Sequence, residues 1–243
     1  SIHFSYEMVA LSHTTARELG LEPENPERPF VEVSGRKGFG VKADDLLDRM
    51  LEKARTEVAT RNQDLTADEC TQIARMIATA AIRYFMIKFS RGRVIVFDID
   101  EALSFEGESG PYIQYALVRA NNILKKLQQR TGENEKDIVQ ALPKIDSSTI
   151  DLGHEGDEAW DLIVESSRLD EIVDQSVRTL ELSVLAKYAF GVEQQFNAFY
   201  HRFPIINEPE TGIRLYRAAA VSYFKTQMTQ TISLMGFEIP TRM

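Results

Sequence analysis

The sequence predicts a mostly α-helical protein, in which an all-helical carboxyl-terminal part follows a smaller part of mixed α and β structure. Two observations predict this class. Apolar residues recur at intervals of three and four over most of the chain, and runs typical of strands occur only in its first hundred residues. Composition changes near residues 105–111, so we place one domain at 1–108 and a second at 109–243.

The amino-terminal part is expected to combine short strands with two helices. Residues 2–11 and 29–33 hold aromatic and β-branched runs, and the proline-rich stretch between them excludes a helix, so we expect two strands joined by a turn or loop. Residues 43–61 carry a helical apolar stripe. The capping box at 66–69 begins a long central helix, and residues 94–99 are the best strand candidate.

The carboxyl-terminal part is expected to be almost wholly helical. Polar and turn residues fill the stretch 131–155, which we interpret as a connection. Gly191 is a candidate for a kink or a boundary between helices. The apolar spacing predicts helices near 112–130, 156–167, 170–203 with a possible break, and 212–236.

Composition excludes several classes of protein. No apolar run approaches the length needed to span a bilayer, and the first residues lack the features of a secretion signal, so we expect no membrane partner. The single cysteine, Cys70, cannot form an internal disulfide, and its apolar helical stripe favours a small buried side chain over a nucleophile. Four scattered histidines give no zinc-ligand spacing. We therefore expect a cytoplasmic protein without a metal site.

The charge balance limits nucleic-acid binding to a local contact. A net charge of −9 argues against nonspecific coating of nucleic acid, because such binding depends on neutralising phosphates. Acidic residues crowd 151–174, whereas cations concentrate on and after the helix that begins at residue 111. These cations are Arg119, Lys125, Lys126 and Arg130.

Residues 105–119 join a glycine-punctuated loop to a helix that bears aromatic side chains. Gly107 and Gly110 give the loop backbone freedom, and Pro111 suits the first turn of a helix. Two rings and a guanidinium then share one helix face, at Tyr112, Tyr115 and Arg119. This face fits either contact with RNA or a capped helix whose tyrosines pack against the protein.

Three further groups of residues are candidates for function. Residues 33–38 place a hydroxyl, two glycines and two cations in a loop suited to phosphate oxygens, the alternative being an exposed turn. On the helix of residues 196–201 we expect Phe199 to pack, and we hold Phe196 and Tyr200 as candidates for stacking on unpaired bases. A third group is acidic, and we expect solvated acids there rather than a metal site. Its members are Asp98, Asp100, Glu101 and Glu106.

Three segments resemble the carboxyl-terminal half of an arginyl-tRNA synthetase, a class I aminoacyl-tRNA synthetase. Residues 105–115 read F-E-G-E-S-G-P-Y-I-Q-Y and resemble the family's F-E-G-[N/D]-T-G-P-Y-[L/I]-Q-Y. Residues 33–47 resemble its degenerate K-M-S-K-S loop and the helix after it. Residues 236–243 resemble its terminal L-G-[I/L]-x-x-P-x-R-M. The resemblance spans nearly the whole chain.

The resemblance implies a fold and an activity. Residues 1–108 would be the α/β carboxyl-terminal remnant of a class I catalytic domain, and residues 109–243 a helical, DALR-type anticodon-binding bundle. The activity would be ATP-dependent attachment of arginine to its tRNA, with Mg²⁺ accompanying ATP. Arginine, ATP and arginine tRNA are the implied partners of the full-length enzyme.

The resemblance also implies site residues. The residues that would bind ATP are Ser34, Gly35, Arg36, Lys37 and Gly38, with catalytic roles for Ser34, Arg36 and Lys37. The anticodon-contacting region would include Tyr112 or Tyr115, with the choice between the two tyrosines left open, together with Arg119, Phe196, Tyr200 and Met243. One departure is that Glu32 and Gly35 occupy the positions of the two lysines of the motif, so Arg36 and Lys37 would supply the charge.

Some parts of a complete synthetase do not occur in these residues. The chain contains no H-I-G-H motif and no nucleotide-binding sheet of repeated βα units, so we expect no aminoacylation by this chain alone. We expect a monomer. The alternative interpretation is a noncatalytic helical module of the same ancestry that binds protein.

Overall fold

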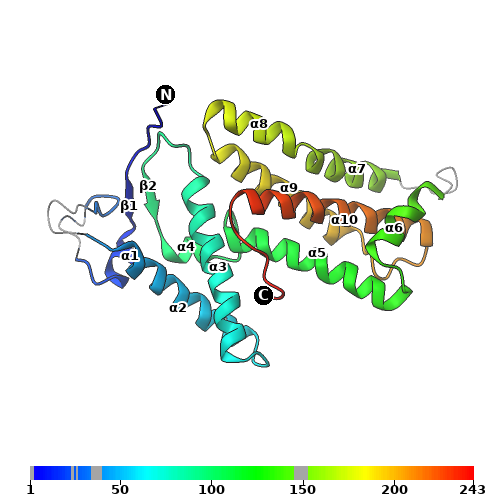
Figure 1. Cartoon of the computed structure of the whole chain (residues 1–243), viewed down its shortest axis with the longest axis horizontal. Helices are drawn as coiled ribbons and strands as arrows, with labels where there is room; N and C mark the ends of the chain where they lie inside the picture. The colour runs from blue at the N-terminus through cyan, green and yellow to red at the C-terminus, as the bar shows by residue number, and fades with distance from the viewer. Residues whose placement is uncertain (1–2, 23–24, 26, 34–39, 145–152) are drawn as a thin grey trace.

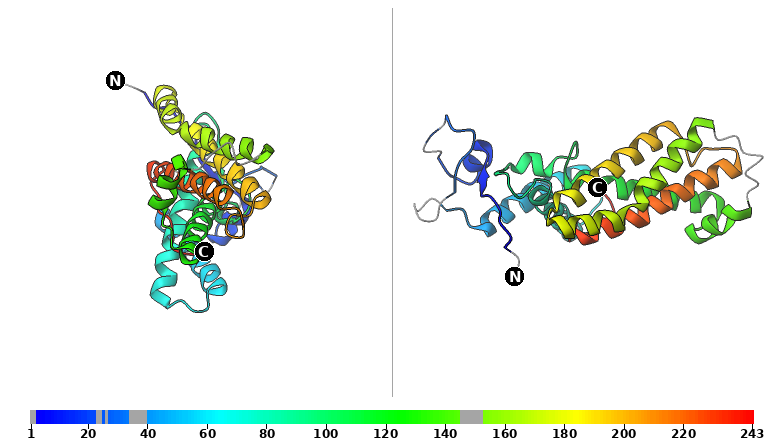
Figure 2. Two further views of the ribbon diagram at one scale, coloured as in Figure 1. Left: turned by 90° about the vertical axis from the view of Figure 1, so that its right-hand side faces the viewer. Right: turned by 90° about the horizontal axis from the view of Figure 1, so that it is seen from above.

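The computed structural model describes residues 3–22, 25, 27–33, 40–144 and 153–243, and it confirms a mostly α-helical protein. The molecule is elongated, with the strands and α1–α4 toward one end and the helices that follow bundled toward the other (Figures 1 and 2). In chain order the elements are β1 (Val9–Leu11), α1 (His13–Glu18), α2 (Ala43–Arg61), α3 (Ala67–Ile87), β2 (Ile95–Phe97), α4 (Ile99–Leu103), α5 (Gly110–Thr131), α6 (Glu135–Ala141), the 3-10 helix η2 (Leu142–Lys144), α7 (Gly153–Ser167), α8 (Leu169–Thr179), α9 (Ser183–Arg202) and α10 (Thr211–Leu234).

β1 and β2 form a two-stranded parallel sheet in which Val9 lies opposite Ile95. The strand expected over residues 29–33 is reduced to one antiparallel bridge between Leu11 and Val31. The expected strand in 2–11 is likewise shorter, since only its last three residues pair. The sheet is therefore smaller than the β-branched runs suggested.

Helix α1 follows β1 directly, where the sequence predicted only a turn or loop. Ser12 caps it, because the Ser12 hydroxyl oxygen accepts a hydrogen bond of 3.1 Å from the backbone N–H of Thr15. Thr15 in turn points inward, and its hydroxyl oxygen accepts from the backbone N–H of Ile99 at the start of α4. Local capping and burial thus support a helix too short for periodicity to reveal.

Helices α2 and α3 form a packed hairpin, as their apolar stripes predicted. The Thr66 capping box is present: its hydroxyl accepts from the backbone N–H of Glu69, whose carboxylate accepts from the backbone N–H of Thr66 at 2.9 Å. Cys70 is buried in the amino-terminal core, as expected. Leu47, which the apolar spacing of residues 43–61 places on the same stripe, is 41% exposed, so the buried face of α2 is narrower than that spacing suggests.

The carboxyl-terminal helices α5 to α10 bury one large hydrophobic cluster. The break expected within 170–203 lies at residues 180–182, where Leu180 adopts the left-handed conformation (φ 57°) and separates α8 from α9. Gly191 is instead an interior residue of α9. Helix α6 lies inside the expected connection 131–155 and was missed, although Asn134 and Asp137 form its capping box.

Helix α3 belongs to both hydrophobic cores. Its residues Ile77 and Phe85 pack in the amino-terminal cluster, whereas Ala80 and Tyr84 pack in the bundle. The close contact between α3 and α5 occurs at Gly110, where a Cβ atom would lie 2.2 Å from the backbone oxygen of Ala80. Gly110 is therefore required for the approach of two helices rather than for the loop that the sequence suggested.

Polar groups complete the junction between the two cores. The Tyr84 hydroxyl donates to the backbone oxygen of Ala186 in α9 at 3.1 Å. The buried Gln114 side chain donates to the backbone oxygens of Met76 in α3 (3.2 Å) and Glu238 in the carboxyl-terminal tail (2.6 Å). The tail thereby lies between α3 and α5, near the middle of the molecule (Figure 1).

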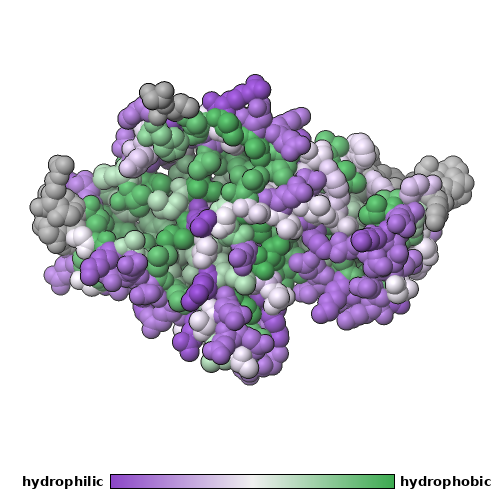
Figure 3. All heavy atoms as spheres, viewed as in Figure 1, coloured by the Kyte–Doolittle hydropathy of each residue, from purple (hydrophilic) through white to green (hydrophobic). Residues whose placement is uncertain are grey.

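The hydropathy of the surface changes along the length of the molecule. In the view of Figure 3, apolar residues gather over the middle of the molecule, whereas hydrophilic residues cover most of the bundle's right-hand end. Among the described residues, no helix is both long and apolar enough to cross a membrane.

We predict that Gly110→Ala destabilises the protein by about 1–3 kcal/mol, because the added methyl group collides with the backbone of α3. Gly191→Ala is the matched control. A Cβ atom there meets nothing within 4 Å, so the better helix former should stabilise α9 by about 0.5–1 kcal/mol. Unfolding in urea measures both variants, and equal stability of the two would contradict the assigned role of Gly110.

Candidate nucleic-acid interface

A surface groove of about 300 Å³ lies where α5, the end of α9 and the carboxyl-terminal tail meet. Four of the residues predicted to contact RNA line this groove: Tyr115, Arg119, Tyr200 and Met243. The structure thus brings together side chains from three segments that are far apart in the sequence. We call this cavity the α5 groove. Its other lining residues are Val118, Asn122, Ile123, Lys126, Ile206 and Arg242.

The guanidinium of Arg119 lies between two aromatic rings of the α5 groove. Its central carbon is 4.6 Å from the ring centre of Tyr115 and 5.4 Å from that of Tyr200. Contact with ring faces holds the cation in place and leaves its charge available. Tyr115 is 36% exposed and Tyr200 is partly exposed, so both rings combine a packed side with a side that meets solvent.

Positive charge accompanies the rings along α5. Asn122 and Lys126 follow Arg119 at intervals of three and seven residues, so they continue the same face of the helix. The sequence placed Lys126 among the cations on and after the helix that begins at residue 111. It did not single out Asn122, although the same helical spacing could have revealed it.

Asn197 connects Arg119 to Tyr112. The Asn197 carbonyl oxygen accepts a hydrogen bond of 2.8 Å from the Arg119 guanidinium, and its amide nitrogen donates to the Tyr112 hydroxyl at 3.2 Å. Tyr112 itself is half-buried against Phe190, with ring centres 6.2 Å apart, and does not line the α5 groove. Of the two tyrosines left open by the sequence, Tyr115 is therefore the one that faces the groove.

Glu193 lies one turn before Asn197 on α9 and is fully buried. The Asn197 amide donates to one of its carboxyl oxygens, and the second oxygen has no hydrogen-bond partner among the described residues. Burial raises the pKa of Glu193 to about 8, although Arg119 and the Asn197 hydrogen bond favour the charged form. The sequence gives no sign of this residue's role, because a helical pattern does not distinguish a buried glutamate from an exposed one.

Phe196 requires a correction. Its ring is fully buried and stacks on Phe224 of α10, with ring centres 4.1 Å apart and planes within 5°. Neither face is open to a base, so Phe196 belongs to the core beside Phe199, whose burial the sequence did predict. Phe196 supports the groove indirectly, since Tyr200 lies against it with ring centres 6.3 Å apart.

An ion pair joins the carboxyl-terminal tail to the amino-terminal part of the molecule. Arg242 forms two hydrogen bonds to the carboxylate of Asp64, of 2.7 and 3.1 Å, in the connection between α2 and α3. The Arg242 cation holds the pKa of Asp64 below its usual range. Met243 packs against the amino-terminal core and also lines the α5 groove. The α2–α3 hairpin therefore takes part in placing one wall of the groove.

The predicted phosphate loop, comprising Ser34, Gly35, Arg36, Lys37 and Gly38, lies outside the described residues. The described neighbour Glu32 is exposed and pairs with Arg28 at 3.0 Å. Contact of this loop with ATP therefore stays a prediction.

Three acids of the group at residues 98–106 take part in a helix cap and in ion pairs. Asp98 caps α4 and accepts a hydrogen bond of 2.6 Å from the Ser12 hydroxyl. Asp100 pairs with Lys53 at 2.6 Å, and Glu101 pairs with Lys88 at 2.7 Å. Within the described ranges, no group of three or more histidine, cysteine, aspartate or glutamate side chains is arranged to hold a metal ion.

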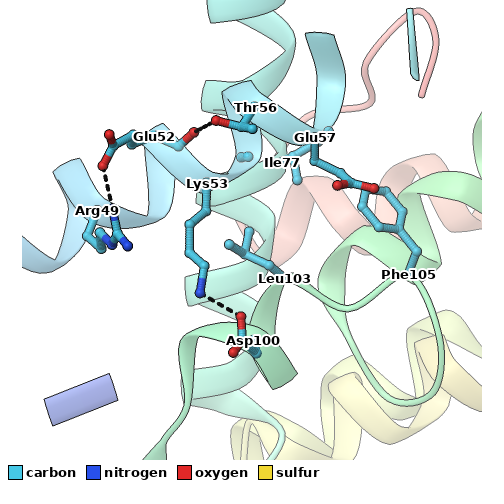
Figure 4. Close-up of a pocket in the computed structure, with 10 residues that line it drawn as sticks. Arg49, Glu52, Lys53, Thr56, Glu57, Ile77, Asp100, Leu103 and Phe105 are labelled. Atoms are coloured by element: carbon cyan, nitrogen blue, oxygen red, sulfur yellow. Dashed lines mark hydrogen bonds and ion pairs between the residues drawn. The ribbon is translucent and has the colours of Figure 1, made fainter. Parts of the chain in front are cut away.

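A second cavity, of about 440 Å³, lies between α2, α3 and α4 (Figure 4). Its cations point toward acids of its own wall: Arg49 pairs with Glu52 at 2.7 Å, and Lys53 pairs with Asp100. Lys53 also meets Glu18 of α1 at 2.8 Å. Because these charges neutralise one another, the cavity is less suited to RNA phosphates than the α5 groove.

Comparisons with known proteins match the two parts of the chain to two families. Residues 113–243 match the DALR anticodon binding domain, and residues 5–99 match the catalytic domain of class I tRNA synthetases (R). The arginine–tRNA ligase of Thermococcus sibiricus is 35% identical over 219 residues, which are 89% of this chain and 33% of that protein. The arginine–tRNA ligase of Pyrococcus furiosus is 32% identical over 100% of this chain and 38% of its own length.

Solved structures give the same result. The arginyl-tRNA synthetase of Thermus thermophilus superposes with a TM-score of 0.75 at 26% identity, over 99% of this chain and 35% of that one. The chain thus spans about one third of the length of the relatives it matches. The catalytic-domain match precedes the DALR match along the chain, and the structural likeness extends over nearly every residue. The chain therefore belongs to the arginyl-tRNA synthetase family, as a carboxyl-terminal part that carries the DALR anticodon binding domain.

Proposed function

We propose that this chain binds the anticodon arm of a tRNA in the α5 groove and that arginine tRNA is its partner. The observation that carries this proposal is the convergence of Tyr115, Arg119, Tyr200 and Met243 on one groove inside the segment that matches the DALR domain. The relatives named above are arginine–tRNA ligases, which supports the choice of arginine tRNA.

The chemistry of the groove suits unpaired bases. Partly exposed rings of Tyr115 and Tyr200 offer faces on which splayed bases stack, and the Asn122 amide can hydrogen-bond a base edge. Arg119 and Lys126 supply cations for the phosphates that accompany those bases. The charges are local, so they are compatible with the acidic balance of the whole chain.

We further propose that the protein to which these residues belong attaches arginine to its tRNA in the cytoplasm, using ATP with Mg²⁺, and acts as a monomer. The match of residues 5–99 to a class I catalytic domain supports this activity. Residues 34–38 would meet the ATP phosphates, where Arg36 and Lys37 can follow charge as it develops. Residues 1–243 correspond to about one third of the relatives, so we do not expect them to suffice for the reaction.

The first test concerns the ring of Tyr200. Tyr200→Ala should weaken binding of arginine tRNA by about 1–3 kcal/mol through loss of base stacking, and Tyr200→Phe should retain most of the affinity. Fluorescence anisotropy with labelled tRNA at moderate salt measures both variants. Trp160→Ala is the control, since Trp160 is 59% exposed on α7 and does not line the groove. Unchanged affinity of a folded Tyr200→Ala would return Tyr200 to a packing role.

The second test concerns the charge of Arg119. If Arg119 meets a phosphate, Arg119→Gln should reduce the slope of log Kd against log salt concentration by about 0.7–1. Arg178→Gln removes the same charge from the exposed face of α8 and should leave the slope unchanged. Equal slopes for wild type and Arg119→Gln would show that Arg119 makes no phosphate contact.

A further inference from the structure

A buried acid lies behind the α5 groove, and the proposed contacts with RNA do not use it. Glu193 is fully buried on α9, whereas most other acids among the described residues are exposed or paired with cations at the surface. One of its carboxyl oxygens meets the Asn197 amide, and the other has no partner among the described residues. Burial of an acid with incomplete hydrogen bonding is costly, so its presence calls for a role.

The position of Glu193 fixes the orientation of the Asn197 amide. An asparagine amide has an NH₂ group that donates and a carbonyl oxygen that accepts. In either protonation state Glu193 keeps an oxygen that accepts a hydrogen bond, and the Asn197 NH₂ group faces that oxygen and the Tyr112 hydroxyl. The Asn197 carbonyl oxygen then faces Arg119 and accepts its hydrogen bond of 2.8 Å. Glu193 thereby determines how both Arg119 and Tyr112 are held.

We propose that Glu193 is a positioning residue of the α5 groove, which orients Arg119 and Tyr112 through Asn197 and makes RNA binding depend on whether Glu193 carries a proton. This inference rests on the proposed function, because it assigns a means of regulation to the same groove. Glu193 itself touches no RNA, since it is buried beneath Asn197.

The charges around Glu193 set the direction of the dependence on pH. Arg119 faces Glu193 from α5, and Tyr84 faces Glu193 from α3. The Glu108 carboxylate lies 3.4 Å from the Tyr84 hydroxyl. Burial raises the pKa of Tyr84, so Tyr84 stays neutral, and Arg119 is the cation that favours ionised Glu193. An RNA phosphate on Arg119 would offset that cation and favour neutral Glu193. Affinity for RNA should therefore fall as rising pH removes the proton.

A first test needs no RNA and measures the titration of Glu193 through stability. The pKa of Glu193 is raised to about 8 in the folded chain, so its neutral form favours folding below the unfolded pKa, and this advantage is lost as pH rises toward 8. Glu193→Gln keeps the shape without the titration. The Tm of Glu193→Gln should equal the wild-type Tm at about pH 5. The difference in favour of Glu193→Gln should then grow as the pH rises to about 8.

The same samples report on the positioning role by NMR. In the wild-type chain, the Arg119 Nε signal and the Tyr112 ring signals should shift together as the pH is changed, with a midpoint at about pH 8. In Glu193→Gln these signals should not shift. Glu171→Gln, which removes an exposed acid of α8, should behave like the wild type. Signals of Arg119 and Tyr112 that stay constant from pH 6.5 to 9 in the wild type would overturn the inference, whatever the RNA result.

The second test uses the anticodon stem-loop of arginine tRNA. For the wild-type chain, Kd should rise about two- to three-fold between pH 7 and 9, which corresponds to a shift of about half a pKa unit on binding. For Glu193→Gln, Kd should not change over this range. A wild-type Kd that is independent of pH would contradict the coupling. Loss of all stem-loop binding with intact NMR titration would instead contradict the proposed function and leave the positioning role of Glu193 supported.

Discussion

Helix α5 can begin against α3 only because residue 110 has no side chain, and the rest of the molecule depends on this contact. A Cβ atom at Gly110 would overlap the backbone of Ala80, so the glycine sets the distance between the two helices. Once they are in contact, α3 serves both hydrophobic cores, and Gln114 joins α5 to α3 and to the tail. The groove that we assign to RNA lies further along the same helix, so its position follows from this junction.

The α5 groove, which we propose as the RNA site, is assembled on a packed core. Phe196 and Phe224 stack in the interior and support the ring of Tyr200 from behind. Arg119 is held by two rings and by Asn197, so its orientation is largely fixed before any ligand arrives. Such preorganisation lowers the entropy cost of binding. The attachment of Arg242 to Asp64 brings the α2–α3 hairpin into the same assembly.

The sequence predicted most of the fold because long amphipathic helices leave a clear periodic signal. The bounds of α2 were found from that signal, and the capping box at Thr66 located the start of α3. Short elements such as α1 and α6 were missed, because helices of six or seven residues show too little periodicity and depend on local caps.

In the site, helical spacing placed Tyr115 and Arg119 on one face of α5. Spacing could not show that Phe196 is buried or that Glu193 lies buried beside Asn197, since both depend on how α9 packs.

We propose that the α5 groove recognises the anticodon, and a competition between two stem-loops for the groove would reveal such recognition. The two RNAs would share one stem and differ only in the three anticodon bases, so that phosphate contacts contribute equally to both. The 243-residue chain should bind the stem-loop with the arginine anticodon about tenfold more tightly, a difference of about 1.4 kcal/mol that one good base contact can supply. Equal affinity for the two stem-loops at moderate salt would contradict it.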